Sequence, residues 1–562
     1  MGIATNRETE RNSHGKTGEA APVFQANDAV SYGGLLFLVP ALLEEGLLKA
    51  RDFYDLPPTH YYGVQSIIMT LAFMALARIK NPEQLKQCKP GELGRLIGLD
   101  RVPEVRCLRQ KIQLFSDQQQ STAFNNELAE CWYEKTDAEN QGFYYIDGHQ
   151  RIYYGTKANL PVKYIARQKL CMSATTEFWV NDAQGLPLMM VIGQLTEKLQ
   201  DAIADLIIPQ MIKANLLTSL APNEEPTVPQ CTFIFDREAY SPKFFNRLWK
   251  DYGIAIISYR KNVTDKYPQE NFIETTTEIF NNQNNMFLYE GKIVLDDYSF
   301  REIRKLNDDG HQVAILTTHP NLPKEQIAVR MFGRWVQENY FKYLESDFDF
   351  DKIIAFGVEQ VDGEKKVVNP PYRKLSHKIN KVREKIQRLE AKFYPLLDQV
   401  IDGTVDQVPK LTVKQGKYQQ QIEQLKQQEE SLMDERSNHH SKIKVKDMPE
   451  QKRYNQLKTE SKKIINIIRM IAYRAETAVA NLISPILENK NADNFKRMIV
   501  KQIINAPADL KPDYENKILL VKLHHLSAKR YNKTIKQLVE LLNQTETLFP
   551  GTDLKMVFEA PG

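Results

Sequence analysis

The spacing of apolar residues along this chain changes three times. From Ser31 to about Phe115 it is helical, and the apolar run over residues 64–79 predicts a buried helix. From Gln141, short apolar and aromatic runs separated by turn residues predict β-strands. Residues 373–475 are rich in Lys, Arg, Gln and Glu, and the segment after them predicts a strand, a helix and a second strand.

The Lys- and Glu-rich region has the apolar seam of a coiled coil. Its first helix steps by four and three positions through Leu375, Ile379, Val382, Ile386, Leu389 and Phe393. The seam ends before Pro395, and a second helix partly continues it with Tyr418, Ile422, Leu425 and Leu432. A third helix is predicted around Ile464, Ile465 and Ile468. We therefore expect a coiled-coil hairpin.

A helix-turn-helix is predicted beside the buried helix. A short helix around Leu93–Ile97 is followed by a glycine, and Pro103 suits the first position of a second helix. That helix would place Arg106 and Arg109 on one face with Lys111 nearby, where they could contact a DNA major groove. A helical hairpin with a solvated basic face explains the same residues equally well.

The order of elements in the middle of the chain is that of an RNase H-like fold. Antiparallel strands are followed by a helix, a strand, a helix, a strand and, later, another helix. The first strand, FYYID, ends on Asp147, and the strand after the first helix, CTFIFD, ends on Asp236. Neighbouring strands of one sheet would bring both carboxylates to the same edge.

A third carboxylate is expected from the late helix. Glu338 lies three residues after Trp335 and seven after Met331, which predicts that it projects from the apolar face toward the sheet. A buried carboxylate needs a cation or a basic partner. The alternative is a salt bridge to Arg334 or Lys342, four residues before and after it.

Other acidic residues compete for this role. They are Glu238, Asp296, Asp297, Asp347, Asp349 and Asp351. None of them combines an apolar-face position with a helix after the last core strand. Three convergent carboxylates suit Mg2+, and two such ions about 4 Å apart can activate a water or a 3′-hydroxyl and stabilise the leaving oxygen of a phosphodiester.

Three segments resemble the acidic motifs of bacterial insertion-sequence transposases of the DDE type: YYIDGHQRIYYG, FIFDREAYSPKFF and MFGRWVQENYFKY. KPGELGRLIGLDRVPEVRCLRQKI and LLNQTETLFPGTDL also look like that group, so the resemblance covers most of residues 31–562. It implies that Asp147, Asp236 and Glu338 are catalytic ligands of two Mg2+ ions, with Mn2+ as a substitute.

One related group has the pattern Tyr-x2-Arg-x3-Glu-x6-Lys around its glutamate. Arg334 and Glu338 match it, but Met331 stands at the tyrosine position and Glu345 at the lysine position. Lys342 is the nearest substitute for that lysine. Arg334 and Lys342 are therefore expected to contact DNA.

Two further residues follow the first aspartate. His149 and Arg151 are expected to approach the scissile phosphate, although single residues of these types are more often surface or structural.

Composition restricts the class of protein. With 562 residues the chain is too long for one core. It has 75 basic and 71 acidic residues, so affinity for DNA must lie in local patches. The five cysteines form no CxxC pair, which argues against a zinc site and a disulfide framework and fits a reducing cytoplasm. No signal peptide or membrane span is evident, so a location in the bacterial cytoplasm, associated with the nucleoid, is expected.

We expect a multidomain α/β protein. The predicted order is a disordered tail (1–30), a helical DNA-binding domain (31–135), the first part of an RNase H-like core (136–259), a β-rich insertion (260–318), the second part of the core (319–371), a coiled-coil hairpin (372–475) and a C-terminal α/β segment (476–562).

The expected function is transposition. The protein would bind the terminal inverted repeats of its element and the target DNA, act as a homodimer in the DNA complex, and cleave and transfer strands. One alternative is a nuclease of the same fold that only hydrolyses DNA. The other is a domesticated, catalytically silent DNA-binding or scaffolding protein, against which the three acids argue.

Overall fold

The computed structural model describes most of the chain. The described residues are 19–156, 158, 160–165, 168–194, 197–221, 226–279, 282–348, 357–364, 366–401, 408–450, 453, 455–483, 493–526 and 531–561. They form two compact units: a large unit from Met1–Tyr154, Val162–Phe356 and Lys458–Gly562, and a hairpin unit from Gly155–Pro161 and Gly357–Leu457. The predicted disordered tail lies outside the described residues up to position 18.

The segment from Gly33 to Glu134 in the large unit is helical. Its described residues form five α-helices and three 3-10 helices. The α-helices are α2 (Val39–Glu44), α3 (Val64–Leu76), α4 (Pro90–Leu96), α5 (Val105–Asp117) and α6 (Ser121–Glu134). The 3-10 helices are Gly33–Leu38, Leu47–Asp52 and Pro82–Gln87. The predicted buried helix is α3, in which every residue except Val64 is buried. A helix that is apolar on all sides can be surrounded by others in this way.

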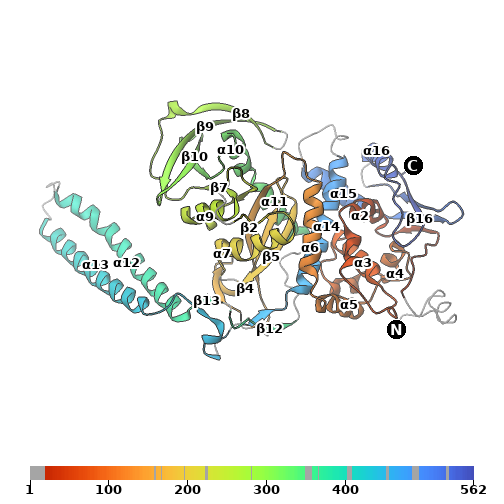
Figure 1. The fold of residues 1–562 in the computed structure, drawn as a ribbon, viewed down its shortest axis with the longest axis horizontal. Coiled ribbons are helices and arrows are strands. Elements are labelled where there is room, and N and C mark those ends of the chain that lie inside the picture. The colour runs from red at the N-terminus through yellow and green to blue at the C-terminus, as the bar shows by residue number, and fades with distance from the viewer. Residues whose placement is uncertain are drawn as a thin grey trace. The chain divides into compact units, whose positions relative to one another are not determined.

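A later helix, α14 (Glu460–Ile483), completes this helical part. It packs beside α3, α6 and α15 (Asp493–Asn505), as Figure 1 shows. Ile464, Ile465 and Ile468 are buried there. The expectation that they form a third helix of the hairpin is therefore wrong, because α14 buries residues on nearly all of its faces within the large unit.

A four-stranded sheet joins the N-terminal and C-terminal segments. Its order is β1 (Asn27–Val30), β16 (Ala508–Asp513), β17 (Ile518–Leu523) and β18 (Lys555–Glu559), with β17 and β18 parallel and the other pairs antiparallel. The helix α16 (Asn532–Asn543) packs against β18. The predicted C-terminal strand, helix and strand are thus confirmed. Phe24 is buried and β1 covers Asn27–Val30. The last part of the predicted disordered tail, residues 1–30, is therefore ordered.

The other large sheet has ten strands. They are β2 (Phe143–Ile152), β3 (Val162–Ile165), β4 (Leu170–Asn181), β5 (Pro187–Gln194), β6 (Cys231–Phe235), β7 (Ile254–Tyr259), β8 (Ile273–Ile279), β9 (Asn282–Leu295), β10 (Tyr298–Leu306) and β11 (Gln312–Thr317). The order is β3-β4-β2-β6-β7-β11-β10-β9-β8, and β5 also pairs with β4. The pairs β2-β6 and β6-β7 are parallel, and all other pairs are antiparallel.

Helices connect the strands of this sheet. α7 (Leu199–Ala202) continues through the π-helical segment Ile203–Ile207 into α8 (Ile208–Lys213). α9 (Pro242–Tyr252) connects β6 to β7. The β-rich insertion has no α-helix among its described residues, as predicted, and it continues the sheet because β11 pairs with β7.

The late helix is divided in two. It was predicted as one helix, but α10 (Lys324–Gly333) ends before Arg334 and α11 (Trp335–Phe348) begins after it. The break changes which side chains of α11 face the sheet.

The hairpin unit contains two long helices and four short strands. α12 (Pro370–Ile401) and α13 (Val408–Ser437) are antiparallel neighbours (Figure 1), and β12 (Val358–Gln360) pairs with β15 (Asn455–Leu457), as β13 (Lys366–Val368) does with β14 (Lys442–Lys444). Val382, Ile386 and Ile422 of the predicted seam form a core between the two helices. Contrary to prediction, α12 continues past Pro395.

The chain is therefore a mixed α/β protein with mixed sheets. Among the described residues, none of the helices is both long enough and apolar enough to span a membrane.

Candidate active site

Two predicted acids lie at the same edge of the ten-stranded sheet. In the parallel pair β2-β6, Phe143 is opposite Thr232 and Tyr145 is opposite Ile234. The same register, continued by two residues, brings Asp147 opposite Asp236. Neighbouring strands are about 4.8 Å apart, so the two carboxylates leave adjacent backbone positions.

Asp236 follows directly after β6 and begins a short 3-10 helix, Arg237–Ala239. Its Oδ1 accepts a hydrogen bond of 2.7 Å from the backbone N–H of Glu238. Burial raises the pKa of the Glu238 carboxyl, and the charge of Asp236 raises it further. Glu238, one of the competing acids, thus adds negative charge to this edge.

The Asp147 carboxyl is strongly perturbed by its surroundings. Burial raises its pKa to about 7, and the charges of Asp236 and Glu238 add to the shift. Arg334 and a 2.9 Å hydrogen bond from the backbone N–H of Gly148 partly oppose it. Burial is therefore the main reason that the charged form of Asp147 is disfavoured, and Arg334 compensates for only part of it.

Arg334 connects two of the three predicted ligands. At the break between α10 and α11, its Nη2 donates a 2.7 Å hydrogen bond to Oε1 of Glu338, and its Nη1 lies 3.7 Å from Oδ2 of Asp147. The salt bridge considered as an alternative role for Glu338 is therefore formed in this structure.

Glu338 is not on the buried face of α11. Its side chain is 45% exposed, and the neighbouring Gln337 is fully buried instead. Gln337 Nε2 donates hydrogen bonds to the Tyr145 carbonyl (3.1 Å) and to Asn181 Oδ1 (2.9 Å). The prediction assumed one continuous helix through α10 and α11. Because the regular helix is interrupted at Arg334, the side chains of α11 that face the sheet differ from those predicted.

A tyrosine at this edge was not anticipated. Ser258 of β7 is opposite Phe235, so the register places Tyr259 opposite Asp236 in the next strand. The Arg237 guanidinium lies 5.7 Å from the centre of the Tyr259 ring. Burial raises the pKa of Tyr259, whereas Arg334 and Arg237 lower it. Its position at the end of IAIISY was the available signal.

Comparison with known proteins identifies the family. A family model described as "Transposase protein" matches residues 1–560. The chain belongs to this transposase family. No curated protein and no solved structure matches it.

Two residues of the transposase that were predicted to contact DNA, Arg151 and His149, instead contact acidic side chains of the same chain. Arg151 is fully buried, with its Nε 3.1 Å from Oε2 of Glu177. The prediction for Arg151 is therefore wrong, because β2 continues past Asp147 and pairs with β4 beneath α14, where Lys462 also pairs with Glu177 at 3.4 Å. His149 lies 3.2 Å from Glu345 and is only slightly exposed, whereas Lys342 is exposed.

The predicted DNA-reading helix exists as α5, which begins at Val105 rather than at Pro103. Arg106 and Arg109 are exposed, and Arg109 forms an ion pair with Glu83. Lys111 is only 5% exposed, and burial lowers its pKa. Lys111 is therefore not on the exposed face of α5, while the roles of Arg106 and Arg109 stay predictions.

Carboxylates at the sheet edge fit a hard divalent cation by charge and ligand type. Within the described part of the chain, no three His, Cys, Asp or Glu side chains are grouped closely enough to hold a metal ion. Asp147 and Asp236 form a pair of carboxylates at adjacent backbone positions. Glu338 is turned to Arg334 and would have to leave it to become a ligand.

Competing acids have other positions. Asp296 and Asp297 have left-handed backbone conformations in the turn between β9 and β10. Asp349 and Asp351 lie outside the described residues. Asp347, at the C-terminal end of α11, pairs with Lys501 at 2.6 Å.

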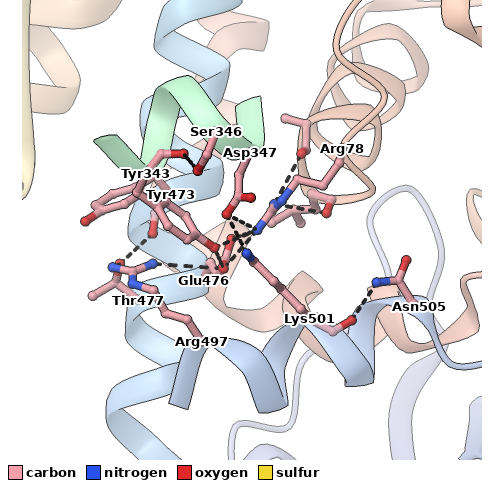
Figure 2. Close-up of polar contacts among 12 residues, drawn as sticks. Arg78, Tyr343, Ser346, Asp347, Tyr473, Glu476, Thr477, Arg497, Lys501 and Asn505 are labelled. Carbon is pink, nitrogen blue, oxygen red and sulfur yellow. Dashed lines mark hydrogen bonds and ion pairs between the residues drawn. The ribbon is translucent and has the colours of Figure 1, made fainter. Parts of the chain in front are cut away.

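Asp347 belongs to a cluster of charges that connects α11 to the helical part (Figure 2). The Tyr343 hydroxyl donates to Oε1 of the buried Glu476, and Arg78 Nη2 lies 2.9 Å from its Oε2. Arg78 Nη2 is also 4.0 Å from Asp347. These contacts hold the C-terminal half of α11 against α14 and α15.

Proposed function

We propose that this transposase cleaves and transfers DNA strands with Asp147, Asp236 and Glu338 as ligands of two divalent cations. Mg2+ is the expected ion, with Mn2+ as a substitute. The observation that supports this most strongly is the alignment of Asp147 with Asp236 across adjacent parallel strands, where burial raises the pKa of Asp147 and the charge of Asp236 adds to the shift. A divalent cation would favour the ionised form of both carboxylates.

The strand order supports an RNase H-like assignment for the core. In the order β5-β4-β2-β6-β7, the first three strands are antiparallel and the last two run parallel to β2. That arrangement matches the order of elements expected for such a core. It also explains why the two aspartates reach one edge, since β2 and β6 run in the same direction.

Bound cations would activate a water or a 3′-hydroxyl and stabilise the leaving oxygen. The residues of the chain would hold these cations and orient the groups that bind them. The rigid sheet fixes Asp147 and Asp236 more firmly than a loop could. Arg334, whose planar guanidinium donates from two nitrogens, orients Glu338 and offsets part of the charge of Asp147.

The proposed partners are the terminal inverted repeats and the target DNA, bound by a homodimer. α4 and α5 would contact the ends, with Arg106 and Arg109 on the reading helix. The seam between α12 and α13 supports a coiled-coil role in assembly.

Glu338→Gln and Asp236→Asn test the catalytic assignment. Each keeps the shape of the side chain and removes a charge that a cation needs, so Mg2+-dependent nicking of DNA with the element's own ends should fall by orders of magnitude. Thermal melting and end binding, measured on the same preparations, should stay close to wild type. A folded Glu338→Gln protein that cuts at nearly the wild-type rate would remove Glu338 from the site.

The products of the same reaction separate transposition from hydrolysis. A transposase joins the cleaved 3′ end to a second duplex, whereas a nuclease releases it. A wild-type protein that binds ends without cutting in Mg2+ or Mn2+ would instead favour the silent DNA-binding alternative.

A further inference from the structure

One side of α12 carries a regular row of positively charged side chains, which we call the basic stripe. Its members step by four and three positions and are all exposed: Lys374, Lys378, Lys381, Lys385, Arg388 and Lys392. At 1.5 Å per residue, the stripe is about 27 Å long. It is straight because it lies on one helix.

The basic stripe runs parallel to the apolar seam. Each member precedes a seam residue by one position, as Lys378 precedes Ile379 and Lys385 precedes Ile386. One residue turns an α-helix by about 100°, so the stripe lies roughly a quarter turn from the seam. Packing of α12 on α13 therefore fixes the direction in which the stripe points.

The charges on this side are not compensated. Among the described residues, Arg388 is the only member with an acidic group within 4 Å, Glu384 at 4.0 Å. Across the groove from Lys385 and Arg388, α13 presents glutamines: Gln421, Gln424 and Gln428. Glutamine amides add hydrogen-bond donors without adding negative charge.

The opposite side of the hairpin is compensated. There Arg383 of α12 lies 2.6 Å from Glu429 of α13, and Lys426 of α13 lies 3.4 Å from Glu390 of α12. The helices also differ in total charge. α12 has eight Lys and Arg against three Asp and Glu, whereas α13 has five of each. A helix whose charged residues served only to keep its surface soluble would need no excess of positive charge, and α13 has none.

We propose that the basic stripe binds the sugar-phosphate backbone of double-stranded DNA without reading its sequence. This rests on the proposed function, which makes DNA the substrate. Duplex DNA has one negative charge per about 1.7 Å of axis, so a rigid row of cations can neutralise several phosphates at once. Contacts to phosphates fix position and orientation rather than sequence.

The salt dependence of binding to a duplex without element ends tests the inference in the full chain. The slope of log affinity against log salt changes by about 0.9 for each phosphate that the protein no longer neutralises. Lys381→Gln with Lys385→Gln should therefore reduce the slope by about 2 and lower affinity at low salt. Arg383→Gln with Lys426→Gln removes the same charge from the other side and should leave the slope nearly unchanged.

The outcomes separate this inference from the proposed function. Equal slopes for both double variants, in proteins that still cut end-containing DNA, would overturn the basic stripe as a DNA surface and leave catalysis standing. If the Lys381→Gln, Lys385→Gln protein lost its binding to polyglutamate but kept its binding to DNA, the partner of the basic stripe would be an acidic protein and not DNA. A reduced slope together with failure of wild-type cleavage would support the stripe and refute the catalytic proposal.

Discussion

The two ends of α11 hold charged clusters that differ in how closely their carboxylates are paired. Near its N-terminal end, Arg334 is shared between Asp147 and Glu338, while Asp236 and Glu238 add negative charge. Burial raises the pKa of Asp147, and Arg334, at 3.7 Å, opposes only part of that shift.

At the C-terminal end the carboxylates are matched. The buried Glu476 accepts from Tyr343 and Arg78, and Arg497 Nη1 lies 3.9 Å from its Oε1 (Figure 2). Lys501 pairs with Asp347. Each carboxylate of this cluster has a basic partner from the chain itself.

The comparison separates two uses of acidic residues on one helix. A matched buried cluster fastens helices together, and removing one member leaves an uncompensated charge. A buried carboxylate with a raised pKa is typical of a functional site, because a bound cation would favour its ionised form.

The largest expected effect on stability is that of Glu476→Gln. Removing this charge leaves the half-buried Arg78 and Arg497 without the buried carboxylate that they share, which should lower the free energy of unfolding by about 3 kcal/mol. Glu338→Gln makes the same change at an exposed i, i+4 pair and should cost about 0.5 kcal/mol or less. Urea unfolding of both variants checks this, and equal losses would break the comparison.

A smaller effect is expected from pH in metal-free buffer. Because the folded-state pKa of Asp147, about 7, lies above its usual 3.8, the folded protein binds this proton more tightly than the unfolded chain does. The free energy of unfolding should therefore fall as pH rises from about 4 to about 7. For a side chain 22% exposed, we expect a loss of roughly 1–2 kcal/mol.

Asp147→Asn provides the control, since it should remove this part of the pH dependence. Mg2+ added to the wild type at pH 8 should restore the lost stability if the site takes the cation. Wild-type stability at pH 8 that does not respond to Mg2+ would argue against the proposed ligands.

The smallest effect separates two tyrosines of α11. Tyr343→Phe removes a hydroxyl that contacts Glu476 and accepts from Arg78 at 2.7 Å, so it should cost about 1–2 kcal/mol. The buried Tyr340 hydroxyl has no hydrogen-bond partner in the described part of the chain, so Tyr340→Phe should be nearly neutral. Thermal melting of the pair measures the difference, and a larger loss for Tyr340→Phe would reverse the assignment.

Local pattern was sufficient to place Asp147 and Asp236 on neighbouring strands, although β2 does not end at Asp147 but continues to Ile152. Asp147 and Asp236 each end an apolar run, and such runs depend on neighbouring residues only. Arg151 and Lys111 could not be placed in this way, because a basic residue is buried only when distant elements cover it. For Arg151 these elements are β4 and α14.

The helix boundaries show a second limit of sequence patterns. The periodicity around Glu338 fits one helix, but the break at Arg334 makes Gln337 the buried residue. Arg334 keeps helical dihedral angles, but the hydrogen bonds from Arg334 to Met331 and from Gln337 to Arg334 span three residues instead of four, so the turn is tighter here than in a regular α-helix. α14 was assigned to the hairpin because its isoleucines follow a helical spacing, which does not indicate which partner the helix packs against.

The sheet that joins β1 to β16 has a consequence for synthesis. The backbone N–H of Ala29 donates to Asp509, 480 residues later, and the Phe24 ring packs on Phe549 with the ring centres 4.7 Å apart. At about 5–20 residues per second, a ribosome needs roughly half a minute to a minute and a half to make the second partner after the first. During that interval the apolar residues of the N-terminal segment lack their native cover, so a chaperone that binds exposed apolar segments has its longest opportunity there.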